Sequence, residues 1–220
     1  MFDWIRHEFL VATADSAYGP RNPLRERVNE EARYTFHPAI MFLMLNFMPT
    51  WVFKSAITAR GVLTEAFLHY HTQGQFNKGS AFIQRWTEHF VSWGIPGQDI
   101  ARFHNGGLFA QVANTMPAAF WMVYRVFSDA GVVREFREEV SKAVAMDDDD
   151  GGSTCSINVR HALASCPVLA STFQEVFRVH GMANSIRVAT EDHMLDGKYL
   201  IKKGGLFMMP ARVQHRLRDV

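Results

Sequence analysis

The chain has 220 residues, enough for one domain with a hydrophobic core, and 48% of them are apolar, which excludes a disordered protein. Its 23 Lys and Arg nearly balance 22 Asp and Glu, for a net charge of +1, so no basic surface argues for nucleic acid as a partner. Two cysteines exclude a disulfide-rich scaffold and fit a reducing compartment.

The hydrophobic pattern predicts mostly helices, followed by a small sheet. Helices are expected over residues 2–18, 22–33, 38–48, 50–72, 81–93, 100–127, 130–146 and 167–180. The acidic, glycine-rich segment 147–154 is expected to be a flexible loop. Strands are expected over 185–190, 193–195, 199–201 and 206–209, with Asp196-Gly197 as a hairpin turn. This order predicts a mainly α fold of the α+β class, formed by a single domain over residues 1–220.

Membrane and metal signals are absent from the sequence. No segment reaches the roughly 18 uninterrupted apolar residues that a membrane-spanning helix needs, so no span is expected. The first ten residues carry charges throughout, so no secretory signal is expected. The ten histidines show no H-x-x-x-H pair, so no metal site is predicted.

The segment 100–127 predicts a long, nearly all-apolar helix with a polar centre that ends in a proline. Pro117 has no N–H to bond to the carbonyl of Ala113, so a kink is predicted beside Ala113 and Asn114. The freed carbonyl, the Asn114 amide and the Thr115 hydroxyl would then form a small polar site. The alternative is a proline-kinked core helix without a chemical role.

The second motif is Gln174-Glu175-Val176-Phe177-Arg178, inside the helix predicted over 167–180. Glu175 and Arg178 are three residues apart, so they share a helix face and can pair. Beside an apolar stripe the pair is expected to be half-buried, which requires further hydrogen bonds. An E-x-x-R spacing is common on solvated helices and by itself indicates no function.

Together these segments resemble the cytochrome P450 family of haem-thiolate oxygenases. A-Q-V-A-N-T-M-P-A-A-F-W resembles the distal central helix, Q-E-V-F-R the E-x-x-R helix, and S-I-R-V-A-T-E-D the strand whose arginine meets a haem propionate. The branch is that of prostacyclin synthase and the sterol 7- and 12-hydroxylases, with their fungal relatives. The resemblance covers almost the whole chain, but only the middle of a family member, and implies part of its helical fold.

The resemblance implies roles for particular residues. Asn114 and Thr115 would be catalytic residues that face bound oxygen or substrate. Glu175 and Arg178 would be structural, and Arg187 would bind a haem propionate.

The resemblance also implies a cofactor and partners. Haem is the expected cofactor, and an NADPH-dependent reductase is the expected redox partner. The substrate would be an apolar small molecule, such as a lipid, a sterol or a secondary metabolite, in a pocket walled by Phe109 and its neighbours. The expected location is cytoplasmic, or the surface of the endoplasmic reticulum as in full-length relatives.

The central helix departs from the usual family pattern, Ala/Gly-Gly-x-acid-Thr. If Ala110 takes the first place, Ala113 stands at the acid and Asn114 at the alcohol. In the other register Asn114 replaces the acid and Thr115 keeps the alcohol. An amide forms hydrogen bonds but supplies no titratable proton, so hydroxylase and isomerase chemistry both stay open.

The cysteines depart further from the family. Its haem iron is bound by a Cys thiolate in a Phe-x-x-Gly-x-x-x-Cys-x-Gly loop, which this sequence does not contain. Cys155 follows four aspartates that disfavour a thiolate, and Cys166 starts a helix on the wrong side of the family fold. Both are expected to be unligated thiols. The chain alone is therefore expected to be a truncated or inactive form; the alternative is a non-catalytic helical binding or interaction module.

Overall fold

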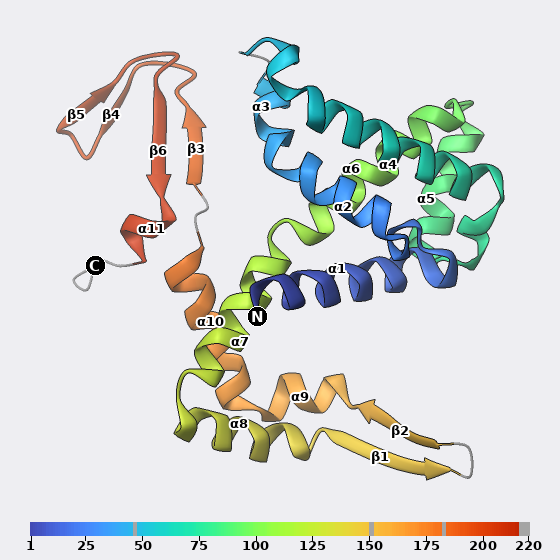
Figure 1. The fold of residues 1–220 in the computed structure, drawn as a ribbon. Helices are drawn as coiled ribbons and strands as arrows, with labels where there is room; N and C mark the ends of the chain where they lie inside the picture. Colours follow the sequence, from blue (N-terminus) through green and yellow to red (C-terminus); the bar gives the residue numbers. More distant parts are fainter. Residues whose placement is uncertain (46–47, 150–151, 182–183, 216–220) are drawn as a thin grey trace. The chain divides into compact units, whose positions relative to one another are not determined.

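The computed structural model describes residues 1–45, 48–149, 152–181 and 184–215. The chain falls into two compact units, Met1–Pro117 and Ala118–Val220. In the part that is described, the first unit is built from helices, and all of the strands lie in the second (Figure 1).

In its described part, the first unit contains six α-helices and the start of a seventh, with short 3-10 helices between some of them. The α-helices are α1 (Phe2–Tyr18), α2 (Arg27–Phe36), α3 (Ile40–Leu45), α4 (Lys54–Thr72), α5 (Ala81–Ser92), α6 (Gly97–Val112) and the first residues of α7 (Thr115–Phe127). The Ser80 hydroxyl accepts a hydrogen bond from the N–H of Ile83 and so caps the start of α5. Gly74 has a φ of 62°, a left-handed conformation that ends α4 at low steric cost.

A chain of hydrogen bonds crosses the core of this unit and connects four helices. The Tyr70 hydroxyl of α4 donates to the backbone oxygen of Tyr18 at 2.8 Å, and the Tyr18 hydroxyl donates to the His104 carbonyl of α6 at 3.0 Å. His104 Nε2 lies 3.1 Å from Thr87 Oγ1 of α5. All four side chains are fully buried, so these bonds offset the cost of removing polar groups from water.

The apolar side chains around this chain of bonds fill the core. Phe67 stacks on the His104 ring at 5.9 Å, and Trp86 meets the same ring edge-on at 5.6 Å. The other fully buried apolar residues include Leu10, Leu24, Leu63, Ile83, Ile100 and Leu108. Their burial provides most of the free energy that holds these helices together.

The burial of His104 predicts a loss of stability in acid. Burial, with a smaller contribution from His71, lowers the pKa of His104 to about 4 from an ordinary value near 6.5. The unfolded chain therefore binds more protons between these pH values, so the free energy of unfolding is full above about pH 6.5 and falls as the pH decreases towards 4. Urea unfolding should show that His104 lowers the free energy of unfolding by about 2 kcal/mol between pH 7 and pH 5.

The matched variants separate His104 from the other histidines. His104→Gln should lose less stability between pH 7 and pH 5 than the wild type, whereas His89→Gln, which changes an exposed ring, should lose as much. Equal losses in all three proteins would contradict the role of the buried ring.

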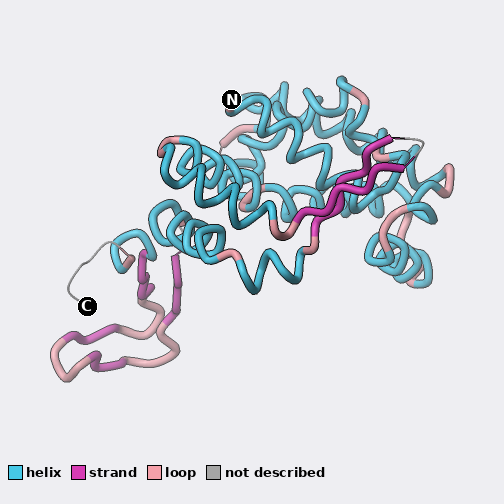
Figure 2. Tube along the Cα trace, turned by 90° about the horizontal axis from the view of Figure 1, so that it is seen from below, coloured by secondary structure: helices cyan, strands magenta, loops and turns pink. Residues whose placement is uncertain are grey.

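The second unit combines helices with paired strands. It contains the remainder of α7, α8 (Ala130–Ser141), β1 (Val144–Asp149), β2 (Gly152–Ile157), α9 (Val159–Ser165), α10 (Pro167–His180), β3 (Asn184–Val188), β4 (His193–Leu195), β5 (Tyr199–Ile201), β6 (Leu206–Pro210) and α11 (Ala211–Gln214). β1 pairs with β2, β3 with β6 and β4 with β5, each antiparallel. Figure 2 shows these pairs in magenta.

A residue distant in the sequence caps the start of α10. The Glu139 carboxylate of α8 accepts hydrogen bonds from the N–H groups of Val168 at 3.0 Å and Leu169 at 3.3 Å. The Cys166 thiol donates to the Glu139 carbonyl at 3.6 Å. A negative charge at a helix N-terminus is favoured by the helix dipole, so Glu139 joins α8 to α10 both electrostatically and by hydrogen bonds.

Removal of this cap should destabilise the protein. Glu139→Ala should lower the free energy of unfolding by about 1 kcal/mol, as the loss of other helix caps does. Glu138→Ala, at an exposed position on the same helix, should leave it nearly unchanged. Urea unfolding at pH 7 measures both, and an equal effect of the two substitutions would argue against the cap.

The predicted mainly helical fold, with a small antiparallel sheet towards the C-terminus, is confirmed. The Asp196-Gly197 turn is also confirmed, with φ values of 53° and 62° in the hairpin between β4 and β5. The single domain over 1–220 stays a prediction.

The structure differs from the expected loop over 147–154. Residues 147–149 and 152–154 lie in β1 and β2, paired in register from Val144↔Ile157 to Asp149↔Gly152, and residues 150–151 lie outside the described part. Cross-strand pairing thus orders acidic and glycine residues that by composition alone suggested a loop. The helix expected up to residue 146 ends at Ser141. The hydrophobic pattern did not predict α9, which begins where the Asn158 side chain accepts a hydrogen bond from the N–H of His161.

Among the described helices, none combines the length and the apolar character needed to cross a bilayer.

Candidate functional site

The long helix predicted over 100–127 is broken at its centre. α6 ends at Val112 and α7 begins at Thr115, with Ala113 and Asn114 between them. Pro117 lies three residues after Asn114, so the break lies where the missing N–H and the ring of the proline disturb the helical hydrogen bonds. The structure thus shows the helix interrupted beside Ala113 and Asn114, where the disturbance was predicted.

The break separates a buried face from an exposed polar one. Val112 and Met116 are 4% and 8% exposed and belong to the core. Asn114 and Thr115 are exposed, which leaves the amide available to a ligand. The Thr115 hydroxyl donates to the Gln111 carbonyl, so its proton is committed while its oxygen can still accept.

Phe109 does not line an open wall at this point. Its ring packs against the core and meets the His37 ring edge-on at 5.1 Å, and the Arg33 guanidinium lies 5.7 Å from its centre. A role for Phe109, Asn114 or Thr115 in a reaction stays a prediction.

The Glu175–Arg178 pair forms on α10 as the spacing predicts. Arg178 Nε donates to Glu175 Oε2 at 2.8 Å, Nη2 donates to Oε1, and Nη1 donates to the His215 carbonyl. The ion pair lowers the pKa of Glu175 and raises that of Arg178.

The expected half-burial of this pair is wrong. The side chains of Glu175 and Arg178 are 58% and 47% exposed, because the buried face of α10 is the one that carries Val176. An exposed pair contributes little to stability, because water screens its charges.

Arg187 lies on β3, opposite Phe207 of β6. Its side chain is exposed, and its Nη1 donates to the carbonyl of the preceding Ile186 at 2.9 Å. The guanidinium is therefore free to bind a carboxylate, as a haem propionate would require.

Neither cysteine is placed as a haem ligand. Cys155 is exposed on β2, and Cys166 is buried with its thiol directed to the Glu139 carbonyl. Within the described ranges, no group of three or more His, Cys, Asp or Glu side chains could hold a metal ion. The described residues thus fit the carboxylates of haem through Arg187, but they do not supply its axial ligand.

Straightening the break should stabilise the chain. Pro117→Ala supplies an N–H that can bond to the Ala113 carbonyl, so helix content should rise and the free energy of unfolding should increase by about 1 kcal/mol. Pro96→Ala removes a proline that lies before α6 and should add no helix. Far-UV circular dichroism and urea unfolding measure both effects. Unchanged or lower helicity in Pro117→Ala would contradict this explanation of the break.

Comparison with known proteins places this arrangement in a family. The cytochrome P450 family model matches residues 24–220. The chain is 30% identical over 223 aligned residues to the cytochrome P450 monooxygenase nodJ of Hypoxylon pulicicidum, covering 100% of this chain and 43% of that protein. It is 27% identical to a cytochrome P450 monooxygenase of Gibberella zeae, covering 99% of this chain and 42% of that protein.

A mammalian sterol enzyme is similar too. The chain is 26% identical to the cholesterol 7-alpha-monooxygenase of Cricetulus griseus, covering 76% of this chain and 34% of that protein. The chain thus spans less than half the length of each of these relatives. The family-model match over most of its residues, together with the helix break and the E-x-x-R pair, shows that the chain belongs to the cytochrome P450 family.

Proposed function

We propose that the chain is the central part of a haem-dependent monooxygenase that oxidises an apolar, lipid-like substrate. The observation that carries this proposal is the break between α6 and α7, which leaves Asn114 and Thr115 exposed at the centre of the segment that resembles the distal helix. The relatives nodJ and the cholesterol 7-alpha-monooxygenase are named as monooxygenases, which supports the reaction class.

Asn114 and Thr115 would position the reactants rather than titrate. An amide can donate and accept hydrogen bonds but holds no titratable proton. Because Thr115 gives its hydroxyl proton to the Gln111 carbonyl, its oxygen would act as an acceptor. When haem is bound, it supplies the oxygen chemistry. The substrate and the choice between hydroxylation and isomerisation would then depend on the pocket around the amide.

The second unit would contribute the anchor for the cofactor. Arg187 carries an exposed guanidinium that suits a haem propionate. The Glu175–Arg178 pair ties α10 to the backbone at His215. Cys155 is exposed and the Cys166 thiol donates to the Glu139 carbonyl, so neither would supply a thiolate to haem, and the 220-residue chain alone would be inactive. The proposed redox partner is an NADPH-dependent reductase. The proposed location is the surface of the endoplasmic reticulum or the cytoplasm.

A second function is favoured by a separate observation. A groove of about 1210 Å³ in the first unit is lined largely by apolar groups, among them Phe82, Trp86 and Phe103. Such a groove can hold an apolar small molecule without iron. The alternative function is therefore a non-catalytic binding module for an apolar ligand.

Carbon monoxide spectra of the reduced, haem-supplemented proteins separate these functions. The full gene product should give a thiolate-type Soret band, and the same band should remain in its Cys155→Ser, Cys166→Ser double variant. The 220-residue chain should give none. A band that is lost in the double variant would show that these cysteines ligate the iron, against the assignment made from their surroundings.

Cholesterol binding tests the alternative function, a non-catalytic binding module. If the full gene product takes up no haem but binds cholesterol saturably, the monooxygenase proposal fails and the binding module is favoured. Phe103→Ser, which makes the groove more polar, should then weaken the binding, whereas Phe173→Ser, at an exposed position on α10, should not.

A further inference from the structure

Arg33 on α2 is a buried cation without a counter-ion. The residue is only 2% exposed. Its Nε, Nη1 and Nη2 atoms are all buried, and none has a hydrogen-bond partner among the described residues. A buried guanidinium normally has a carboxylate or several acceptors, because an uncompensated charge in the interior is strongly destabilising.

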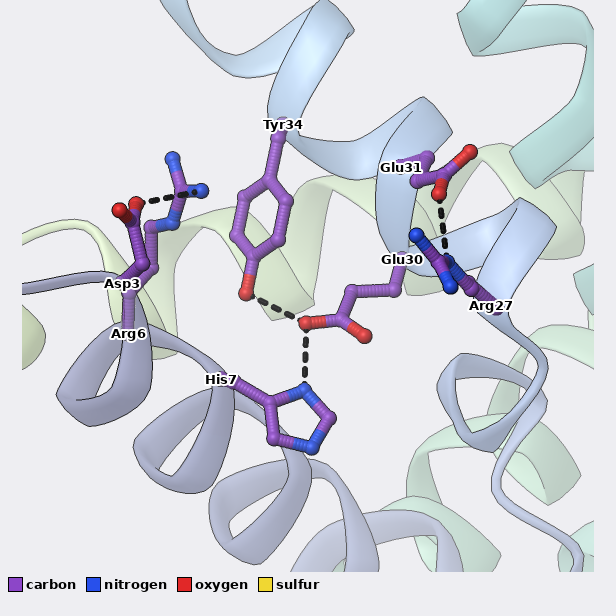
Figure 3. Close-up of polar contacts among 7 residues, drawn as sticks. All are labelled: Asp3, Arg6, His7, Arg27, Glu30, Glu31 and Tyr34. Carbon is purple, nitrogen blue, oxygen red and sulfur yellow. Dashed lines mark hydrogen bonds and ion pairs between the residues drawn. The ribbon is translucent and has the colours of Figure 1, made fainter.

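The carboxylates drawn in Figure 3 have partners other than Arg33. Glu30 Oε1 accepts from the Tyr34 hydroxyl and lies close to His7 Nδ1, each at 2.7 Å. Glu31 pairs with Arg27 at 2.8 Å, and Asp3 pairs with Arg6 at 3.0 Å. None of these contacts involves Arg33.

Arg33 instead lines a small cavity within the first unit. The cavity has a volume of about 160 Å³. Its polar lining consists of Arg6, Arg33, Tyr34 and His37, and its apolar lining includes Leu10 and Val112. No Asp or Glu is among the described residues that line it, so the cavity combines basic groups at one place with apolar walls.

The charge of the cavity is positive at neutral pH. Burial lowers the pKa of Arg33 to about 10, which still leaves the guanidinium charged at pH 7. Burial and the charge of Arg33 lower the pKa of His37 to about 4, so this ring is neutral and contributes no opposing or added charge. Arg6 Nε is a further buried donor without a partner in the described part.

We propose that this cavity binds the carboxylate of a small apolar acid. In this structure the three guanidinium nitrogens of Arg33 are buried, so binding requires the side chain to turn towards the cavity. Its planar fork then matches a carboxylate with two parallel hydrogen bonds, while Leu10 and Val112 contact the hydrocarbon part. The site is distinct from the proposed reaction site, because Val112 and Met116 face the cavity whereas Asn114 and Thr115 are exposed. It therefore adds a ligand-binding function that does not depend on haem.

Calorimetric titration of the 220-residue chain with hexanoate tests this proposal. Hexanoate should bind saturably, and 1-hexanol and inorganic phosphate should bind at least tenfold more weakly, because the first lacks the charge and the second lacks the hydrocarbon. Arg33→Met should weaken hexanoate binding at least tenfold, and Arg33→Lys should weaken it less. Arg27→Met, which changes an exposed arginine on the same helix, should bind as the wild type does.

The thermal unfolding midpoint, measured with and without hexanoate, tests binding in variants whose stability is altered. Hexanoate should raise the unfolding midpoint of the wild type and of Arg27→Met, but not that of Arg33→Met. Without hexanoate, Arg33→Met should unfold at or above the wild-type midpoint, since it removes an unpaired buried charge. The proposal is overturned if hexanoate does not bind, if hexanol or phosphate binds as well, or if Arg33→Met binds hexanoate unchanged. These outcomes concern the first unit alone and leave the oxygenase proposal to the spectra of the full gene product.

Discussion

The hydrogen bonds through His104 are the constraint on which the first unit depends. Tyr18 of α1 and Thr87 of α5 bond to His104 of α6, and Tyr70 of α4 bonds to the backbone oxygen of Tyr18, all within a buried core. Each buried polar group in this chain of bonds would be costly without its partner, so the four helices have one favourable arrangement. His104 lies about two turns before the end of α6. The bonds to His104 therefore fix the part of α6 that leads into the break.

The helix break exposes polar groups on a segment that also packs against the core. A continuous helix would satisfy the Ala113 carbonyl and carry Asn114 as one more surface residue. With Pro117 after it, the helix stops at Val112 and resumes at Thr115; Asn114 and Thr115 are exposed there, whereas Val112 and Met116 are buried. One face of the same segment thus seals the core and the Arg33 cavity, while the other carries the groups proposed to meet substrate. This division explains how an apolar helix can serve packing and chemistry together.

The sequence predicts the parts that local chemistry dictates. The proline break, the Glu175–Arg178 pair and the Asp196-Gly197 turn each depend on residues within four positions of one another, and the structure contains all three. The sequence does not predict contacts between distant segments. Glu139 caps α10 from 29 residues away, and the Tyr18 hydroxyl meets His104 across 86 residues. The burial of Arg33 depends on which distant segments pack over it, so its neighbours in sequence do not predict it.

The central claim is that the exposed amide at the helix break meets the substrate. A crystal structure of the full gene product with haem and cholesterol bound would test it most directly, through the distance from the Asn114 side chain to the nearest ligand atom. The account predicts an Asn114 oxygen or nitrogen within hydrogen-bonding distance, about 3 Å, of a ligand atom or of a single water that bridges to it. An Asn114 side chain that points to bulk solvent, with the bound molecules remote from the break, would contradict it.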